Sequence, residues 1–256
     1  MFLKYLFFLL LFFFSCSSTE QVVYLNDTDE LKGWSTKQLN FNDEKISIGD
    51  ILKIDVITLI PEASQPYNKV TTNSLSTNNI EIMKLEGYII DNDGNINFPV
   101  LGKIECENLS FKELSKKITE LLISGNHLLN PIVNVRRLNS KFTILGEVRN
   151  PGTFSYYEKY LNIFQALGYA GDFTIDGKKN DIKLIRSENG IQKLYRLELS
   201  SSEILKSKFY NIQNNDVIIV NPSFSKRKSA GFIGSPSSIA SMASLLLSIT
   251  LLIINN

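Results

Sequence analysis

Residues 109–125, with the sequence LSFKELSKKITELLISG, carry the clearest helical pattern in the chain. Ser110 stands three residues before Glu113, which is the spacing of a capping box at the start of a helix. The apolar residues that follow recur every three or four positions, so they form one face that can be buried. This face consists of Phe111, Leu114, Ile118, Leu121 and Leu122. We predict a helix that begins after Ser110 and ends at Gly125, which occupies the C′ position.

Strand patterns lie on both sides of this helix. Upstream, three apolar residues alternate with polar ones, which is the period of a half-buried strand. They are Leu52, Ile54 and Val56. Downstream, Val133 and Val135 alternate with polar residues in the same way. Residues 62–82 are rich in Ser, Thr and Asn, and this composition predicts a loop.

The turn Asp91-Asn92-Asp93-Gly94 has two interpretations. One is a hairpin between residues 87–90 and residues 95–100. The other is the start of a calcium-binding loop, but such a loop needs glycine at its sixth position, where Ile96 stands. We therefore predict the hairpin. Together with the helix and the strands, it makes residues 46–138 a small α+β unit.

Residues 139–222 form a second unit of several strands and one short helix. Phe142 and Ile144 alternate with polar residues, and the turn Asn150-Pro151-Gly152 follows. Asn162 is the predicted cap of a short helix that closes around residues 168–171. Further strands are predicted at residues 182–186, 194–199 and 216–220, with the turn Asn189-Gly190 between the first two. Several strands packed on one helix suggest a β-grasp-like domain.

The N-terminus has the pattern of a secretory signal. Lys4 precedes an apolar stretch over residues 5–14, which is too short to span a membrane. Cys16 follows directly after Ser15, which suggests a bacterial lipoprotein whose signal peptide is residues 1–15 and whose Cys16 carries lipid such as palmitate. The alternative is ordinary signal cleavage beside an incidental cysteine. Residues 16–45 are polar and read as a tether.

The C-terminal residues 230–256 are uncharged and largely apolar. Ser235 is a suitable N-cap and Pro236 a suitable first helical residue. A helix over residues 236–254 would be about 28 Å long, close to the ~30 Å hydrocarbon core of a bilayer. We therefore predict a C-terminal membrane-spanning helix.

Four serines recur along this tail at helical spacing and share one stripe: Ser237, Ser241, Ser244 and Ser248. One interpretation is a plain tail anchor whose small residues pack against a neighbouring helix. The other is an amphipathic span with the stripe facing water. Because one helix cannot enclose a pore, the second interpretation needs a homo-oligomeric ring. About eight helices, each about 10 Å wide, would enclose a lumen on the order of 15 Å.

The rest of the sequence offers little chemistry. The 27 basic and 26 acidic residues give a net charge of +1, which argues against a nucleic-acid partner. His127 is the one histidine and we expect it in a solvated loop, so we predict neither metal nor cofactor. Cys106 is expected to be structural, and the basic pairs Arg136-Arg137 and Lys178-Lys179 to be solvated. No catalytic motif is present, so no enzyme activity is expected.

An ordered set of segments resembles the outer-membrane polysaccharide export family, the Wza-type (OPX) translocons of capsule and exopolysaccharide secretion. The segments are Ile48-Gly49-Asp50, YIIDNDGNINFPVLGKI at 88–104, LGEVRNPGTF at 145–154, QALGYAGD at 165–172, residues 181–186 and NDVIIV at 215–220. By this resemblance, residues 46–138 are the polysaccharide export domain, residues 139–222 a soluble-ligand-binding β-grasp (SLBB) domain, and the tail part of a helical barrel. The motif residues, expected to be structural, are Gly49, Asp50, Gly94, Pro99, Gly102, Gly146, Pro151, Gly152, Gly171 and Asp216.

The resemblance also implies a function and partners. The expected protein is a lipid-anchored subunit of an outer-membrane polysaccharide export channel, with its domains in the periplasm. The polymer would pass through the ring without bond chemistry. The implied partners are an inner-membrane polysaccharide co-polymerase, often a tyrosine kinase, and the polysaccharide itself. The alternative is a non-conducting periplasmic SLBB adaptor, a scaffold lipoprotein of a secretion complex.

Overall fold

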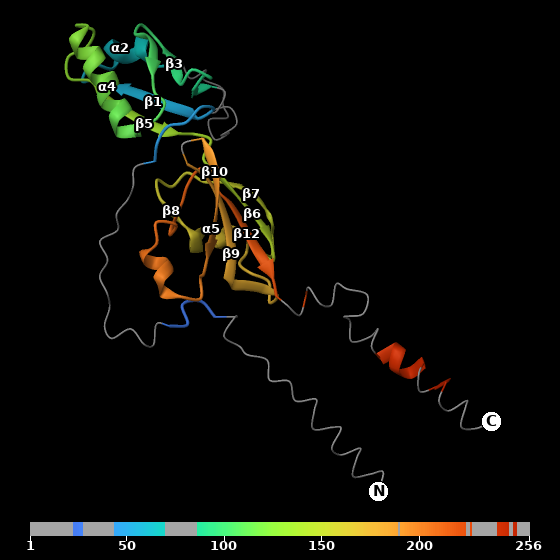
Figure 1. Ribbon diagram of the computed structural model, residues 1–256. Helices are drawn as coiled ribbons and strands as arrows, with labels where there is room; N and C mark the ends of the chain where they lie inside the picture. The colour runs from blue at the N-terminus through green and yellow to red at the C-terminus, as the bar shows by residue number, and fades with distance from the viewer. Residues whose placement is uncertain are drawn as a thin grey trace.

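Two units of mixed α and β structure follow one another along the chain, and each has its own buried apolar core (Figure 1). The structure is a computed structural model that describes residues 23–27, 44–69, 86–188, 190–223, 226, 240–245 and 248–249. The first unit begins at Glu44 and ends with the strand at Ile132–Arg137. The second unit follows it directly and ends at Pro222. The predicted α+β class is confirmed for these two units.

The first unit is built around a three-stranded antiparallel sheet. Strand β1 (Ile51–Ile57) lies between β2 (Tyr88–Ile89) and β5 (Ile132–Arg137). The helix α4 (Phe111–Ser124) packs on β5. A hairpin of β3 (Asn95–Phe98) and β4 (Gly102–Glu105) completes the unit with the short helices α2 (Pro61–Ser64) and η4 (Gln65–Tyr67).

The capping box predicted for α4 is confirmed. The Ser110 hydroxyl accepts a hydrogen bond from the Glu113 N–H at 3.2 Å, and the Glu113 carboxylate accepts one from the Ser110 N–H at 2.7 Å. The helix buries Leu114, Ile118 and Leu122 completely. Gly125 was predicted at C′ but occupies the C-cap, and the left-handed residue that follows it is Asn126, with φ of 55°. Asparagine tolerates this conformation because its short polar side chain can hydrogen-bond locally.

The predicted hairpin across residues 91–94 was wrong about its strands. The turn exists, since the Gly94 N–H donates to the Asp91 carbonyl at 3.0 Å. However, β2 on one side of it pairs with β1, and β3 on the other side pairs with β4. The pattern missed β4 because that strand is short and only Ile104 in it is buried. Val100, predicted to extend the strand, has φ of 65° and lies in the turn that joins β3 to β4.

The loop predicted for residues 62–82 was wrong over its first part. Residues Pro61–Ser64 form α2 and residues Gln65–Tyr67 form η4. A proline stands in the first turn of each, where its fixed φ suits the helix and its missing N–H costs nothing. The Asn68 side chain ties this segment to Val56 by two hydrogen bonds of 2.8 Å. Residues 70–85 lie outside the described part of the chain.

The second unit is a five-stranded sheet with one helix against one face. The strand order is β10-β9-β12-β6-β7, in which β6 and β12 are parallel and the other pairs are antiparallel. The strands are β6 (Lys141–Gly146), β7 (Gly152–Ser155), β9 (Gly177–Glu188), β10 (Ile191–Leu197) and β12 (Val217–Pro222). The other elements are α5 (Ile163–Tyr169), η5 (Ser202–Lys206) and a small ladder of β8 (Leu161–Asn162) with β11 (Asn211–Ile212).

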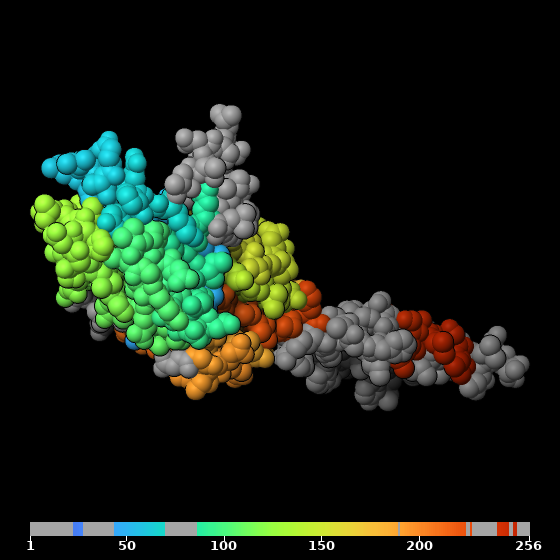
Figure 2. Space-filling view, turned by 90° about the horizontal axis from the view of Figure 1, so that it is seen from above, coloured from blue at the N-terminus to red at the C-terminus, as the bar shows by residue number. Residues whose placement is uncertain are grey.

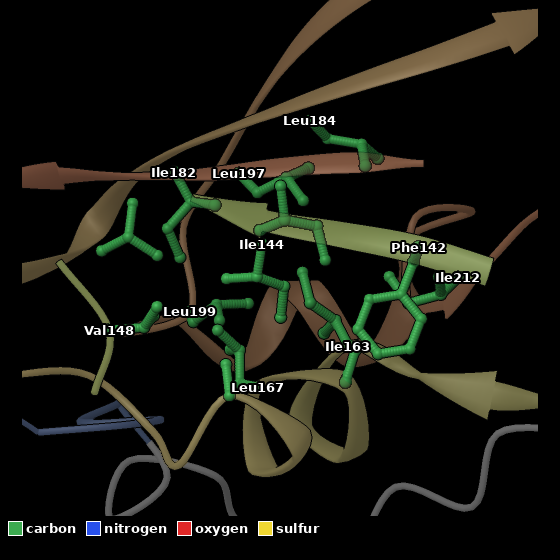
Figure 3. Packing of buried hydrophobic residues seen from close by; sticks show 14 of the residues in the cluster. Phe142, Ile144, Val148, Ile163, Leu167, Ile182, Leu184, Leu197, Leu199 and Ile212 are labelled. Carbon is green, nitrogen blue, oxygen red and sulfur yellow. The ribbon is translucent and has the colours of Figure 1, made fainter. Parts of the chain in front are cut away.

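The core of the second unit lies between the sheet and α5 (Figure 3). Phe142 and Ile144 of β6 are fully buried there, as their alternation predicted, and Leu167 of α5 packs against them. The cap on α5 is also as predicted, because the Asn162 side chain accepts from the Gln165 N–H at 2.9 Å. A helix this short is not stable in isolation, so its packing on the sheet must stabilise it.

The predicted C-terminal span falls mostly outside the described residues, as do Cys16, Ser237 and the signal sequence. Residues 240–245 and 248–249 are described and helical. Among all the described residues, no helix has the length and apolar character needed to cross a membrane.

Gly146 provides a test of the parallel contact between β6 and β12. Its φ is 91°, and a Cβ placed there would lie 2.1 Å from the Val220 carbonyl oxygen. We expect Gly146→Ala to lower the free energy of unfolding by at least about 2 kcal/mol, because both the backbone conformation and the packing oppose a side chain. Denaturant unfolding would measure the change. The control is Gly168→Ala, where nothing lies within 4 Å of the added Cβ and the change should stay within about 1 kcal/mol. Equal effects would contradict the assignment.

Candidate functional site

Residues 23–27 and the residues just after β12, which are far apart in sequence, meet at one end of the second unit, which we call the terminal pole. Its centre is the loop of residues 172–176. The Tyr24 hydroxyl donates to the Asp172 carboxylate, and beyond β12 the Ser223 N–H donates to the Asp176 carbonyl at 2.7 Å. Lys226 pairs with Glu147 at 2.8 Å beside the same loop. Figure 1 shows residues 23–27 (blue) and the end of β12 at the same end of this unit.

Residues 23–27, which we call the strap, lie on the terminal pole by backbone and side-chain contacts. The Leu25 N–H donates to the Leu199 carbonyl at 3.1 Å and the Asn26 N–H to the Ser200 carbonyl at 2.7 Å. The Asp27 carboxylate accepts from the Ser202 N–H at 2.7 Å. The tether prediction for residues 16–45 did not anticipate this packing. The run Val22-Val23-Tyr24-Leu25 is the one apolar signal in that polar stretch that could have indicated it.

Asp27 is held by hydroxyls as well as by the backbone. The hydroxyls of Ser201 and Ser202 each donate to its carboxylate at 3.0 Å. Burial raises the pKa of Asp27, but the hydrogen bonds from Ser202 and Ser201 outweigh it and leave the pKa below its ordinary value. The site therefore binds the charged form of this carboxylate.

Lys179 lies under the strap and was wrongly predicted to be solvated. Only 7% of its surface is exposed. Its ammonium group lies 4.9 Å from the ring centroid of Tyr24 and 4.9 Å from that of Phe173, which are cation–π distances. Burial lowers the pKa of Lys179. Two aromatic faces and the nearby Asp172 thus replace part of the water that this cation loses.

A second polar cluster joins the two units, and we call it the junction. The Arg137 guanidinium contacts the Asp50 carboxylate at 3.0 Å and also donates to Glu44. From the second unit, the Asn214 amide donates to Asp50 at 3.2 Å. The Asn139 side chain accepts from the Ile51 N–H at 3.0 Å, just where the chain passes between the units. Asp50 therefore contacts both units at once.

Arg137 was wrongly predicted to be solvated, whereas Arg136 is exposed as predicted. The Arg137 side chain is 5% exposed and that of Asp50 is 3% exposed. Burial lowers the pKa of Arg137, but the charges of Asp50 and Glu44 more than offset this and raise it. Burial raises the pKa of Glu44 despite the attraction of Arg137. The junction is thus a desolvated ion-pair cluster.

Asp216 forms a second buried ion pair, within the second unit. The Arg186 guanidinium on β9 donates to both carboxylate oxygens of Asp216, at 2.9 and 2.6 Å. Asp216 also accepts from the Gln213 N–H at 2.8 Å, which fixes the turn before β12. This bidentate geometry ties β9 to the start of β12.

The other motif residues occupy turns and tight contacts. Five of the glycines have positive φ, a conformation that disfavours other residues. They are Gly49, Gly94, Gly102, Gly146 and Gly171. Gly152 begins β7 directly after Pro151, and Pro99 lies in the turn between β3 and β4. These positions shape the backbone.

The described part of the serine stripe bonds to its own helix. Ser241, Ser244 and Ser248 are exposed. The Ser244 hydroxyl donates to the Ser241 carbonyl at 2.9 Å, and the Ser248 hydroxyl to the Ser244 carbonyl at 2.8 Å. Met242, Leu245 and Ile249 are also exposed between them. The hydroxyls of Ser244 and Ser248 are thus satisfied locally, without needing water.

Groups that could carry chemistry are few in the part of the chain that the structure describes. That part contains no cluster of three or more His, Cys, Asp or Glu residues able to hold a metal ion. His127 is exposed, with its ring 6.0 Å from that of Tyr67. Cys106 is buried and unpaired, and burial raises its pKa to about 11, which disfavours the reactive thiolate.

Comparison with known proteins gives two matches. Residues 40–137 match the family described as "Polysaccharide biosynthesis/export protein". A relative from Ralstonia solanacearum, named "EPS I polysaccharide export outer membrane protein EpsA", is 28% identical over 148 residues. That match covers 56% of this chain and 38% of the relative, so the chain spans well under half of the relative's length.

The junction predicts a large difference between two substitutions of the same kind. Asp50→Asn removes the more deeply buried of the two carboxylates that contact Arg137, and it should lower the free energy of unfolding by about 3–5 kcal/mol. Asp55→Asn removes a half-exposed partner of Lys53 and should change it by less than about 1 kcal/mol. Urea unfolding of both variants checks this. An equally small effect at both positions would contradict a stabilising role of the buried Arg137–Asp50 pair.

The strap predicts a pH dependence. The pKa of Asp27 lies below its ordinary value of 3.8 in the docked strap. Its carboxylate therefore favours docking at every pH above 3.8, and this contribution is lost as the pH falls through the lowered pKa. In the native protein, the protection of the Ser202 N–H against hydrogen exchange, relative to the intrinsic rate at each pH, should fall over that acidic window. In Asp27→Asn the exchange should already be fast at neutral pH and should lack this transition.

Proposed function

We propose that this chain is a subunit of an outer-membrane polysaccharide export channel, because residues 40–137 match the family described as "Polysaccharide biosynthesis/export protein" and a relative is named an export outer membrane protein. In this proposal residues 46–138 are the export domain. Residues 139–222 are an SLBB-type β-grasp domain, which the packing of α5 on a mixed sheet with parallel β6 and β12 supports. The tail from residue 230 onward crosses the outer membrane.

The observation that carries the proposal is the terminal pole. The strap leads back to Cys16 and β12 leads on to the tail, and both leave the same end of the second unit. A lipid on Cys16, seven residues before Val23, would stay within about 25 Å of this pole. Both membrane attachments would then serve one membrane, and the export unit would extend away from it into the periplasm.

The far end of the export unit fits a contact with another protein. Ile57 and Ile132 are cross-strand neighbours there and both are exposed. Leu59, Ile60 and Leu129 lie close to them in sequence and are exposed as well. Figure 2 shows α2 (cyan) and the loop after α4 (lime green) at the end of the molecule away from the second unit. Exposed apolar residues gathered at one end support binding of an inner-membrane co-polymerase at that end.

A channel requires several copies, since one tail helix encloses nothing. We propose a ring of about eight copies with a lumen on the order of 15 Å, whose walls are the tail helices. The polymer passes through this lumen with weak, exchangeable contacts, because tight binding would oppose flow.

The alternative is a non-conducting adaptor lipoprotein, and the serine stripe provides the observation that favours it. Hydroxyls bonded to their own helix tolerate an apolar environment and allow another helix to approach closely. A tail of this kind could pack against a different membrane protein without lining a pore. The two functions differ in self-assembly and in whether the C-terminus reaches the cell surface.

Surface labelling with native mass measurement separates the two functions. Asn256→Cys should react with a membrane-impermeant maleimide on intact cells, because the tail ends outside the outer membrane. The control, Gln192→Cys on the exposed strand β10, should react only after the outer membrane is permeabilised. The detergent-extracted native chain should have a mass of several protomers. A monomeric mass with Asn256→Cys shielded on intact cells would support the adaptor and contradict the channel.

A further inference from the structure

The surface under the strap has the features of a peptide-binding site, and we call it the strap groove. It is formed by side chains of α5, the loop that follows it, the first part of β9 and the segment after β10. The residues are Phe164, Asp172, Phe173, Lys179 and residues 199–202. Residues distant in sequence thus converge on a segment of five residues.

The groove binds the strap backbone in a fixed register. The carbonyls of Leu199 and Ser200 accept from the N–H groups of Leu25 and Asn26. Leu199 is itself held by its N–H, which donates to the Lys179 carbonyl at 2.7 Å. These acceptors bind main chain, so they select a backbone conformation, here a bend with Leu25 at φ of 48°, rather than a particular sequence.

Two side chains of the strap provide selectivity. The Tyr24 ring packs edge-to-face on Phe164 and Phe173, with centroids 5.6 and 5.7 Å away, above the buried ammonium of Lys179. Its hydroxyl donates to Asp172, which favours tyrosine over phenylalanine. At the other end, the Ser202 N–H and the hydroxyls of Ser201 and Ser202 converge on the Asp27 carboxylate, which favours an acid over an amide.

We propose that the strap groove is a binding site for a short, bent, acidic peptide with a tyrosine three residues before an aspartate, and that the chain's own strap is its occupant. The site acts as a latch on the N-terminal segment. With the strap docked, only residues 16–22 separate Cys16 from the terminal pole, a reach of about 25 Å. With the strap released, residues 16–43 separate Cys16 from Glu44, a reach of about 90 Å. The latch is defined by the groove itself and does not depend on the channel.

Peptide binding in trans tests the site. A fluorescent peptide of residues 21–30, QVVYLNDTDE, is titrated into the full-length Tyr24→Ala/Asp27→Ala variant, whose own strap can no longer fill the groove. We expect saturable binding. Binding to the native chain should be at least tenfold weaker, because a tethered strap competes at an effective concentration in the millimolar range.

Changes in the peptide test selectivity without disturbing the protein's fold. Peptides with Tyr24→Ala or with Asp27→Asn should each bind the double variant at least tenfold more weakly, and a peptide of reversed sequence should not bind. A Lys179→Met change in the double variant should weaken binding, whereas the matched Lys178→Met should not. The proposal would be overturned if no saturable binding were seen. It would also be overturned if the Asp27→Asn peptide or the reversed peptide bound as tightly as the unchanged peptide.

Hydrogen exchange in the full-length chain provides a second measurement in case the double variant does not fold. Asp27→Asn should accelerate exchange of the Ser202 N–H at least tenfold and leave the Ser110 N–H in the first unit unchanged. Unchanged exchange at Ser202 would count against the latch. All these measurements use the isolated chain and none involves export, so their outcome is separate from that of the surface-labelling experiment.

Discussion

The buried guanidinium of Arg137 is the interaction on which the arrangement of the two units depends. It ends the last strand of the first unit and contacts Asp50, which stands just before the first strand of that unit. Asp50 in turn accepts from Asn214 of the second unit. The ion pair lies within the first unit, and the Asn214 amide connects it to the second unit, so this hydrogen bond favours arrangements of the two units in which it is made. A buried ion pair of this kind contributes more to conformational specificity than to net stability.

A fixed junction gives the molecule two distinct ends. At the terminal pole, the strap and the residues after β12 contact one loop, at Asp172 and Asp176. At the other end, the first unit exposes Ile57 and Ile132 side by side. If the junction rotated freely, these two ends would have no constant relation to each other. The polar contacts of Asp50 and Asn139 therefore matter beyond their own cluster, because they determine what the chain presents at each end.

The sequence predicted what depends on local pattern and missed what depends on distant partners. The caps at Ser110 and Asn162 and the alternation through Phe142 and Ile144 involve neighbours in the chain, so their spacing was sufficient. Arg137 and Lys179 occupy positions that read as solvated, and their partners Asp50 and Tyr24 are far away in sequence. The strap was missed because its apolar run is short and its partners, such as Asp172 and Ser202, are far away in sequence. Asp50 and Asp216 were singled out only through the family resemblance, and their burial as ion-pair partners gives these positions a physical role.

The latch and the junction together solve one geometric problem of the proposed channel. A ring forms only if every copy presents its tail helix at the same angle to the membrane. A rigid body with a single attachment is free to tilt about that point. A second attachment at the same pole prevents the body from tilting in the direction of the line that joins the two attachments. In the proposed channel, the contacts of Tyr24 and Asp27 would keep a lipid attachment at Cys16 close to the pole from which the proposed membrane-spanning tail also leaves. The junction then transmits this orientation to the export unit. Neither the latch nor the junction needs catalytic residues. This fits the buried charges in the described part of the chain, since Arg137 and Arg186 form ion pairs and Lys179 contacts the strap.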